Sequence, residues 1–96
     1  MQFLITAYDG TDSEAQARRN AARPAHIDEA KSLLAGGHVL IGGAIMNDDN
    51  EMIGSSLVVE FESRNELDQW LQNDPYVTCN VWQDITVQAF RTAVRA

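Results

Sequence analysis

The sequence has one cysteine, few basic residues and no long apolar run, and each of these shortages excludes a class of protein. Cys79 stands alone, so no intrachain disulfide can form and nothing indicates export; the cytoplasm is the expected location. No stretch approaches the roughly 18 apolar residues of a membrane-spanning helix, so no transmembrane segment is expected. The first residues, Met1–Thr6, lack the basic flank and the cleavage site of a signal peptide.

The scarcity of basic residues leaves the chain acidic. Seven Lys and Arg residues stand against 14 Asp and Glu residues, which gives a formal net charge of −7 at pH 7. Nucleic acids and anionic membrane surfaces bind basic faces, so neither is an expected partner. Arg18, Arg19 and Arg23 nevertheless fall within six residues. This cluster is either a local anion site or a solvated helix face paired with Glu14 and Asp28, and we favour the second for Arg18 and Arg19.

Four apolar segments rich in β-branched residues predict four strands. The strands are expected over Gln2–Tyr8, Val39–Ile45, Ile53–Phe61 and Asp84–Arg91. Asp12 or Ser13 can cap a helix within Glu14–Ala22. Because a proline is tolerated in a first helical turn but not in a helix interior, Pro24 is expected to interrupt or restart this helix, and the firm helix is predicted over Pro24–Ala35.

The second helix begins at a capping box, in which Ser63 is the cap and Glu66 lies three residues on, and Asp74-Pro75 ends it. The resulting order, strand-helix-strand-strand-helix-strand, is typical of the ferredoxin-like βαββαβ sandwich. We therefore predict a single α+β domain over residues 1–96, with an antiparallel four-stranded sheet and both helices on one face.

The strands do not alternate between apolar and polar residues as a sheet with one wet face should. Phe3–Ile5, Val39–Ile41 and Leu57–Val59 put apolar side chains on both faces. Two helices can cover only one face, so a monomer would expose a large apolar patch. We predict a homodimer in which the sheets pack into a closed or nearly closed barrel. The sequence does not decide whether such dimers assemble further. A pocket is expected between helices and sheet or near the dimer seam.

Two short islands place an ionisable side chain beside each of the two prolines. Arg23-Pro24-Ala25-His26 opens a helical stretch, and Asp74-Pro75-Tyr76-Val77 closes another. If the fold brings His26 and Asp74 together, the carboxylate fixes the tautomer of the imidazole through one ring nitrogen, and the other nitrogen can take a proton from a substrate. The alternatives are a satisfied core histidine and an aspartate that only terminates a helix.

Further residues are candidates for substrate binding. Arg23, one turn before the histidine, could anchor a carboxylate or phenolate, or form a surface salt bridge of little worth. Ser55 could donate a hydrogen bond to a substrate oxygen. Tyr76 could line the pocket with its hydroxyl inward, or serve packing alone. Gly43 and the glycine before it could let a ligand approach the strand closely, or mark a β-bulge.

Together these segments resemble the YciI-like family, also called YCII-related domain proteins, of the dimeric α+β barrel superfamily. The resemblance spans nearly the whole chain and rests on Arg23–Ile27, Gly42–Ala44, Gly54-Ser55, Asp74–Val77 and Gln83–Phe90. It implies a ferredoxin-like fold, a dimer and an active site built on His26 and Asp74. The chain departs from the family pattern at Ala44, where many members have proline, and at Cys79-Asn80, where many have Ala-Gly.

The family includes a dehydrochlorinase that acts on a chlorinated aromatic breakdown product, and the wider superfamily includes muconolactone isomerases. The resemblance thus implies a small cofactor-free lyase or isomerase for a small cyclic or aromatic-derived acid or phenol, which works by proton abstraction with elimination or isomerisation. The alternative is a non-catalytic domain that binds a small ligand. The histidines and Cys79 show no metal-ligand spacing, so no metal is expected.

Overall fold

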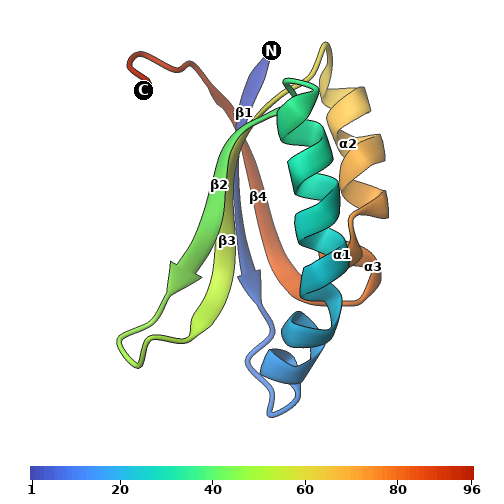
Figure 1. Cartoon of the computed structure of the whole chain (residues 1–96), viewed down its shortest axis with the longest axis vertical. Coiled ribbons are helices and arrows are strands. Elements are labelled where there is room, and N and C mark those ends of the chain that lie inside the picture. The colour runs from blue at the N-terminus through green and yellow to red at the C-terminus, as the bar shows by residue number, and fades with distance from the viewer.

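The computed structural model describes all 96 residues and contains four strands and three helices. The strands are β1 (Gln2–Asp9), β2 (Val39–Met46), β3 (Met52–Glu60) and β4 (Trp82–Phe90), and the helices are α1 (Ala15–Ala35), α2 (Arg64–Asn73) and α3 (Pro75–Thr78) (Figure 1). The predicted order is confirmed, and α3 is a single helical turn before the last strand. None of the helices combines the length and apolar character needed to span a bilayer.

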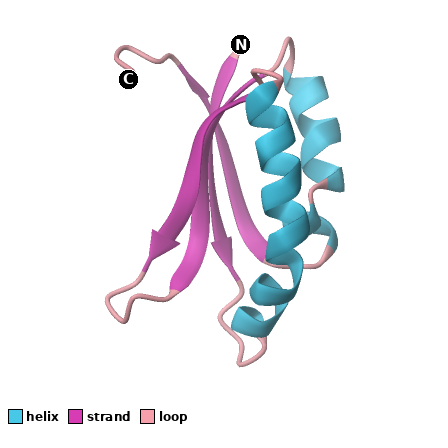
Figure 2. Ribbon diagram, viewed as in Figure 1, coloured by secondary structure: helices cyan, strands magenta, loops and turns pink.

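The strands form one antiparallel sheet in the order β2-β3-β1-β4, which confirms the predicted fold class. Both long helices lie against the same face of the sheet, and the opposite face is uncovered (Figure 2). The molecule is therefore a two-layer sandwich in which β2 and β4 are the edge strands.

The core lies between the helices and the inward face of the two central strands. Alternate residues of β1 point inward, and Phe3, Ile5 and Ala7 are buried. Val59 and Leu57 of β3 lie opposite the first two of these in the register and are buried with them. Each large apolar side chain buried in this way contributes about 1.5–3 kcal/mol to stability, so this strip holds the two layers together.

Helix α1 runs without interruption through Pro24, so the predicted break at this residue is wrong. A proline inside a helix removes one backbone hydrogen bond and costs about 3 kcal/mol. Packing on both sides of the proline offsets this cost, because Arg19, Ala22 and His26 are all buried. These residues recur at i, i+3 and i+7, so only one continuous helix places them on the same inward stripe.

The predicted signals at the start of α2 and at the end of α1 are confirmed. The predicted cap of α1 at Asp12 or Ser13 is wrong, because Glu14 occupies the N-cap position and no side chain caps the helix there. Ser63 accepts a hydrogen bond from the Glu66 N–H at 3.2 Å, which is the first half of the capping box. The Glu66 carboxylate reaches back to the N–H of Glu62 rather than to that of the cap itself. Helix α1 is followed by Gly36 and by Gly37, whose φ of 82° is a conformation that glycine adopts without strain.

Candidate active site

A cavity of about 450 Å³ lies between α1 and the β2 side of the sheet, and several of its lining residues are small. By strand register, Gly42 and Ala44 of β2 lie opposite Leu57 and Ser55 of β3, both of which are buried on the inward face. Ala30 lines the cavity from α1. The volume of the cavity is in the range of small-molecule sites.

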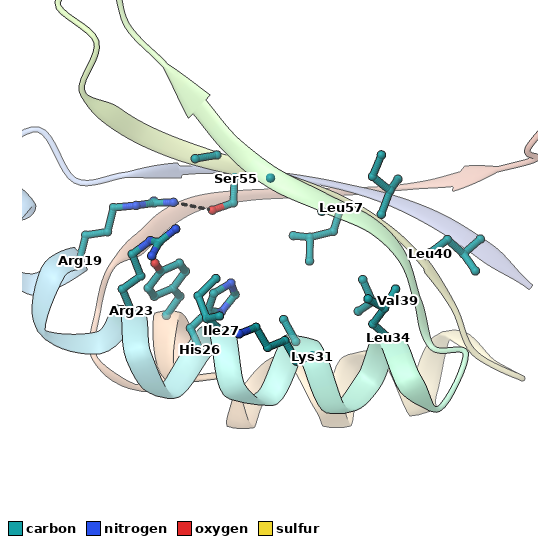
Figure 3. Close-up of a pocket in the computed structure, with 16 residues that line it drawn as sticks. Arg19, Arg23, His26, Ile27, Lys31, Leu34, Val39, Leu40, Ser55 and Leu57 are labelled. Atoms are coloured by element: carbon teal, nitrogen blue, oxygen red, sulfur yellow. Dashed lines mark hydrogen bonds between the residues drawn. The ribbon is translucent and has the colours of Figure 1, made fainter. Parts of the chain in front are cut away.

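Polar groups gather at one end of this cavity and apolar groups at the other (Figure 3). The polar end is formed by Arg19, Arg23, His26 and Ser55. Tyr76 also lines the cavity and lies against His26. The apolar end is formed by Leu34, Val39, Leu40 and Leu57. The site therefore suits a molecule with an apolar body and a polar, hydrogen-bonding end.

His26 and Asp74 meet in a buried pair. Nδ1 of His26 lies 2.9 and 3.2 Å from the two carboxylate oxygens of Asp74, and both residues are buried. A carboxylate only accepts hydrogen bonds, so Nδ1 carries the hydrogen. Nε2 makes no hydrogen bond within the protein. It is not one of the fully buried polar atoms without a hydrogen-bond partner, so it is accessible from outside the protein core. It is therefore the nitrogen that His26 offers to the cavity.

The backbone around Pro75 places the Asp74 carboxylate. Asp74 has φ −65° and ψ 135°, the extended conformation that a residue before proline favours. It ends α2 and also caps α3, because its Oδ1 accepts a hydrogen bond from the Tyr76 N–H at 2.8 Å. Asp74 thus terminates a helix and contacts His26 at the same time, so the two interpretations of this residue are compatible.

Two aromatic rings fix the plane of the imidazole. The ring of Tyr76 stacks on His26 with centroids 3.8 Å apart and an interplanar angle of 10°. Trp82 meets the same imidazole edge-on at 5.4 Å and also contacts Tyr76 at 5.4 Å. The imidazole is held by its face, its edge and Nδ1, which leaves Nε2 as its free atom.

Arg19 is buried inside the site, so the interpretation of this residue as part of a solvated helix face is wrong. Its Nη1 donates to the carboxylate of Asp9 at 2.8 and 3.0 Å. Its Nη2 donates to the Gly54 carbonyl at 3.1 Å and to the Ser55 hydroxyl oxygen at 3.0 Å. A charge this deep needs such partners, and the guanidinium links the end of β1 to β3 beside the cavity.

Arg18, the neighbouring arginine, does lie on the surface, but its partner differs from the expected Glu14 or Asp28. It forms an ion pair with Asp12 at 2.6 Å. The hydrogen bond from this guanidinium holds the pKa of the Asp12 carboxyl well below its usual range. The pair ties the loop before α1 to the first turns of the helix.

A signal for Arg19 is present in the sequence. Arg19 and Ala22 precede His26 at the spacing of one helical stripe, but a break at Pro24 conceals this relation. Asp9 likewise continues the alternation of buried residues along β1. Reading the helix through the proline therefore places a second ionisable side chain on the face that carries the histidine.

Ser55 accepts hydrogen bonds from two sides. Besides Arg19, the indole Nε1 of Trp82 donates to its Oγ at 3.1 Å. Trp82, which is buried as a core residue, thus also bridges Ser55 and the imidazole. This link is invisible in the sequence, because 27 residues separate the indole from the serine.

The remaining predicted residues lie around the cavity. Arg23 is exposed and makes no ion pair. Lys31, which was not predicted as a site residue, lines the same wall of the cavity and is likewise exposed and without an ion pair. Gly43 also lines the cavity, and a side chain there would meet nothing within 4 Å. The strand register is regular at Gly43, and its shifts fall at Leu40 and before Met46, so the bulge alternative for this glycine is wrong.

Burial shapes the ionisation of two groups beside the pair. It raises the pKa of the Tyr76 phenol, an effect that the nearby charges of Arg19 and Arg23 partly oppose. The hydroxyl therefore stays protonated and can donate to a ligand. Burial also raises the pKa of the Glu29 carboxyl, and the negative charge of Asp74 adds to this effect.

The architecture and the site define a ferredoxin-like α+β domain with a buried His–Asp pair on the wall of a small-molecule cavity. The profile of the YCII-related domain matches residues 1–91, and the chain belongs to this family. It is similar to Protein YciI of Escherichia coli and of Shigella flexneri, with 31% identity over 97 residues that cover 95% of this chain and 97% of each relative.

Solved structures resemble the chain as well. It is similar to the 5-chloro-2-hydroxyhydroquinone dehydrochlorinase of Burkholderia phenoliruptrix, solved in complex with 2,5-dihydroxybenzoquinone, with 28% identity and a TM-score of 0.82. That match covers 95% of this chain and 94% of the dehydrochlorinase. A protein from Mycobacterium tuberculosis, at 16% identity and a TM-score of 0.62 over 98% of this chain and 100% of its own, shares the fold alone.

Proposed function

We propose that this protein is a small enzyme that abstracts a proton from a cyclic or aromatic-derived acid or phenol, with elimination or isomerisation. The observation that carries the proposal is an imidazole whose Nδ1 is bound to a buried carboxylate and whose Nε2 is free at a cavity wall. In this role His26 is the general base and Asp74 orients it.

The reaction follows from this geometry. Nε2 of His26 takes a proton from a C–H or O–H bond of the substrate, and the electron pair left behind forms a new double bond. Either a leaving group departs with its own electron pair, or an existing double bond shifts. The carboxylate of Asp74, 2.9 Å from Nδ1, stabilises the imidazolium that forms, because little water reaches the pair to screen it. The proton is then returned to the product or released to solvent.

The substrate class rests on the chemistry of the cavity and on the relative. The dehydrochlorinase acts on a chlorinated, hydroxylated ring, as its name states, and its solved complex contains a hydroxylated quinone. The cavity of this chain offers apolar walls, among them Ile27 and Leu57, to the faces of such a ring. Arg23 and Lys31 lack acidic partners and attract a phenolate or carboxylate in an otherwise acidic protein.

Carbon deuteration tests the proposal without knowledge of the natural leaving group. The protein is incubated in D2O with hydroxyquinones, chlorinated hydroxyhydroquinones and phenolic acids, and mass spectrometry follows deuterium on carbon and the release of chloride. We expect exchange or elimination for at least one compound that binds in the cavity. Binding without any exchange or elimination would favour the alternative, a ligand-binding domain with no turnover.

The two unpaired cations give a prediction for binding. Replacing both Arg23→Gln and Lys31→Gln is expected to weaken the binding of 2,5-dihydroxybenzoquinone roughly three- to thirtyfold, because exposed charge pairs contribute up to about 1 kcal/mol each. Titration calorimetry at low and high salt measures the effect, which salt should diminish. Arg64→Gln, on the far helix α2, is the control and should leave affinity unchanged. An unaltered salt dependence in the double variant would contradict this assignment.

We also propose that two copies pack through the uncovered face of the sheet. Ile41, Val58 and Leu4 lie side by side across β2, β3 and β1 on that face, and Ile41 is 68% exposed. Phe90 and Tyr8 add further exposed apolar surface to the same side. A second copy would cover this strip with matching side chains and remove it from water.

Sedimentation tests the homodimer. We expect a dimer at micromolar concentration for the unmodified protein and a shift to monomer for Ile41→Glu, because a carboxylate in the middle of the interface would lose its water. Gln72→Glu, on the solvent side of α2, adds the same charge elsewhere and should leave the dimer intact. A monomer for the unmodified chain over the whole concentration range would rule out this assembly.

A further inference from the structure

The hydrogen-bonding state of Ser55 is determined by its neighbours. Its Oγ receives a hydrogen bond from Nη2 of Arg19 at 3.0 Å and another from Nε1 of Trp82 at 3.1 Å. A serine hydroxyl has two lone pairs and one hydrogen. Guanidinium and indole N–H groups only donate, so both lone pairs are occupied and neither neighbour can accept the hydroxyl hydrogen.

The hydroxyl hydrogen can therefore point only toward the cavity. Ser55 is buried, makes no other hydrogen bond and lines the cavity wall across from α1 (Figure 3). We propose that Arg19 and Trp82 are positioning residues that leave Ser55 only the role of donor, so that the site favours an accepting ligand oxygen, and most strongly one with negative charge: a carbonyl, an enolate or a phenolate. This proposal rests on the proposed function. It adds that the negative charge formed when His26 removes a proton lies on the ligand oxygen that Ser55 contacts.

The buried pair behind the serine keeps this arrangement rigid. Asp9 holds the other arm of the Arg19 guanidinium at 2.8 Å, and the Gly54 carbonyl shares Nη2 with the hydroxyl. The guanidinium also lies 4.8 Å from the centre of the Tyr76 ring, on which the imidazole stacks. The donor and the base are thus braced by the same group, which is the preorganisation that stabilises a developing negative charge.

A double-mutant cycle tests the proposal, with 2,5-dihydroxybenzoquinone as the probe. Affinity and the visible spectrum of the bound probe, which reports its ionisation, are measured for the unmodified protein, Ser55→Ala, Trp82→Phe and the double variant. Ser55→Ala should weaken binding roughly ten- to hundredfold, as loss of a hydrogen bond to a charged oxygen does. Trp82→Phe should weaken it several-fold, but should add nothing to Ser55→Ala, because the indole acts through the serine.

The controls separate positioning from packing. Trp70→Phe removes an indole N–H that lies outside the cavity, so it should leave probe affinity unchanged. Arg19→Lys keeps the charge but loses the two-armed contact, and circular dichroism checks that it folds. If Arg19→Lys binds the probe as tightly as the unmodified protein does, the guanidinium has no geometric role.

Three outcomes would overturn the proposal: strictly additive effects in the cycle, unchanged binding to Ser55→Ala, or no binding of the probe to the unmodified protein. Failure of the proposed function gives a different pattern. If Ser55 and Trp82 are coupled in binding while no ligand undergoes exchange that depends on His26, the donor assignment stands and the protein is a binding domain without turnover.

Discussion

Replacement of His26 by alanine should slow carbon deuteration or elimination roughly 100- to 10,000-fold, the usual contribution of a positioned general base. The variant removes the imidazole whose Nδ1 is held by a carboxylate and whose Nε2 is free at the cavity. Probe affinity should change only a few-fold, because Ser55, Arg23 and Lys31 still contact the ligand. Mass spectrometry in D2O measures the rate, and titration calorimetry measures the affinity.

The other histidine provides the matched control. His38 is exposed, bonds the Glu60 carbonyl through Nδ1 and lies outside the cavity lining. His38→Ala should retain the full rate of exchange. A folded His26→Ala variant that turns over a bound compound as fast as the unmodified protein would refute the catalytic role of His26.

Removal of the Asp74 charge should have the second largest effect. Asp74→Asn keeps the size of the side chain and an oxygen that can cap α3, but it removes the negative charge facing the imidazolium that forms in the reaction. We expect a fall in rate of roughly a hundredfold or more, with ligand binding nearly unchanged. Steady-state kinetics should therefore show the loss in kcat rather than in KM.

A graded series separates the electrostatic role of Asp74 from its structural one. Asp74→Ala should slow the reaction as Asp74→Asn does. It also removes the cap on the Tyr76 N–H, so it should lower the free energy of unfolding by about 1–2 kcal/mol. Asp68→Asn, an exposed carboxylate paired with Arg64, is the control for charge and should alter neither quantity. Equal rates in the Asn variant and the unmodified protein would mean that the carboxylate only shapes the turn.

The fold could be predicted because its determinants are local. Apolar segments rich in β-branched residues, the Ser63 cap and the Gly36-Gly37 stop each act within a few residues, and all correspond to observed strands or helix ends. Pro24 is the exception. Its local preference is against a helix interior, but burial of residues on both sides holds one helix together, and that packing depends on the whole fold.

Half of the site was accessible to the same reasoning. His26 lies on a recognisable helical face, and Asp74 stands before a proline, so each could be singled out and their contact anticipated. Arg19 shares the helical face of His26, but the expected break at Pro24 conceals this relation. The contacts of Arg19 with Asp9 and of Trp82 with Ser55 depend on where α1 and three strands meet, and no spacing rule in the sequence reports such long-range partners.

The most direct test of the central claim is the tautomer of His26, observed by nitrogen NMR of the imidazole in its neutral form. The structure predicts that Nδ1 bears the hydrogen, shared with Asp74, and that Nε2 has the chemical shift of an unprotonated, accepting nitrogen. A hydrogen fixed on Nε2 of the neutral ring would contradict the account, because no base would then face the cavity.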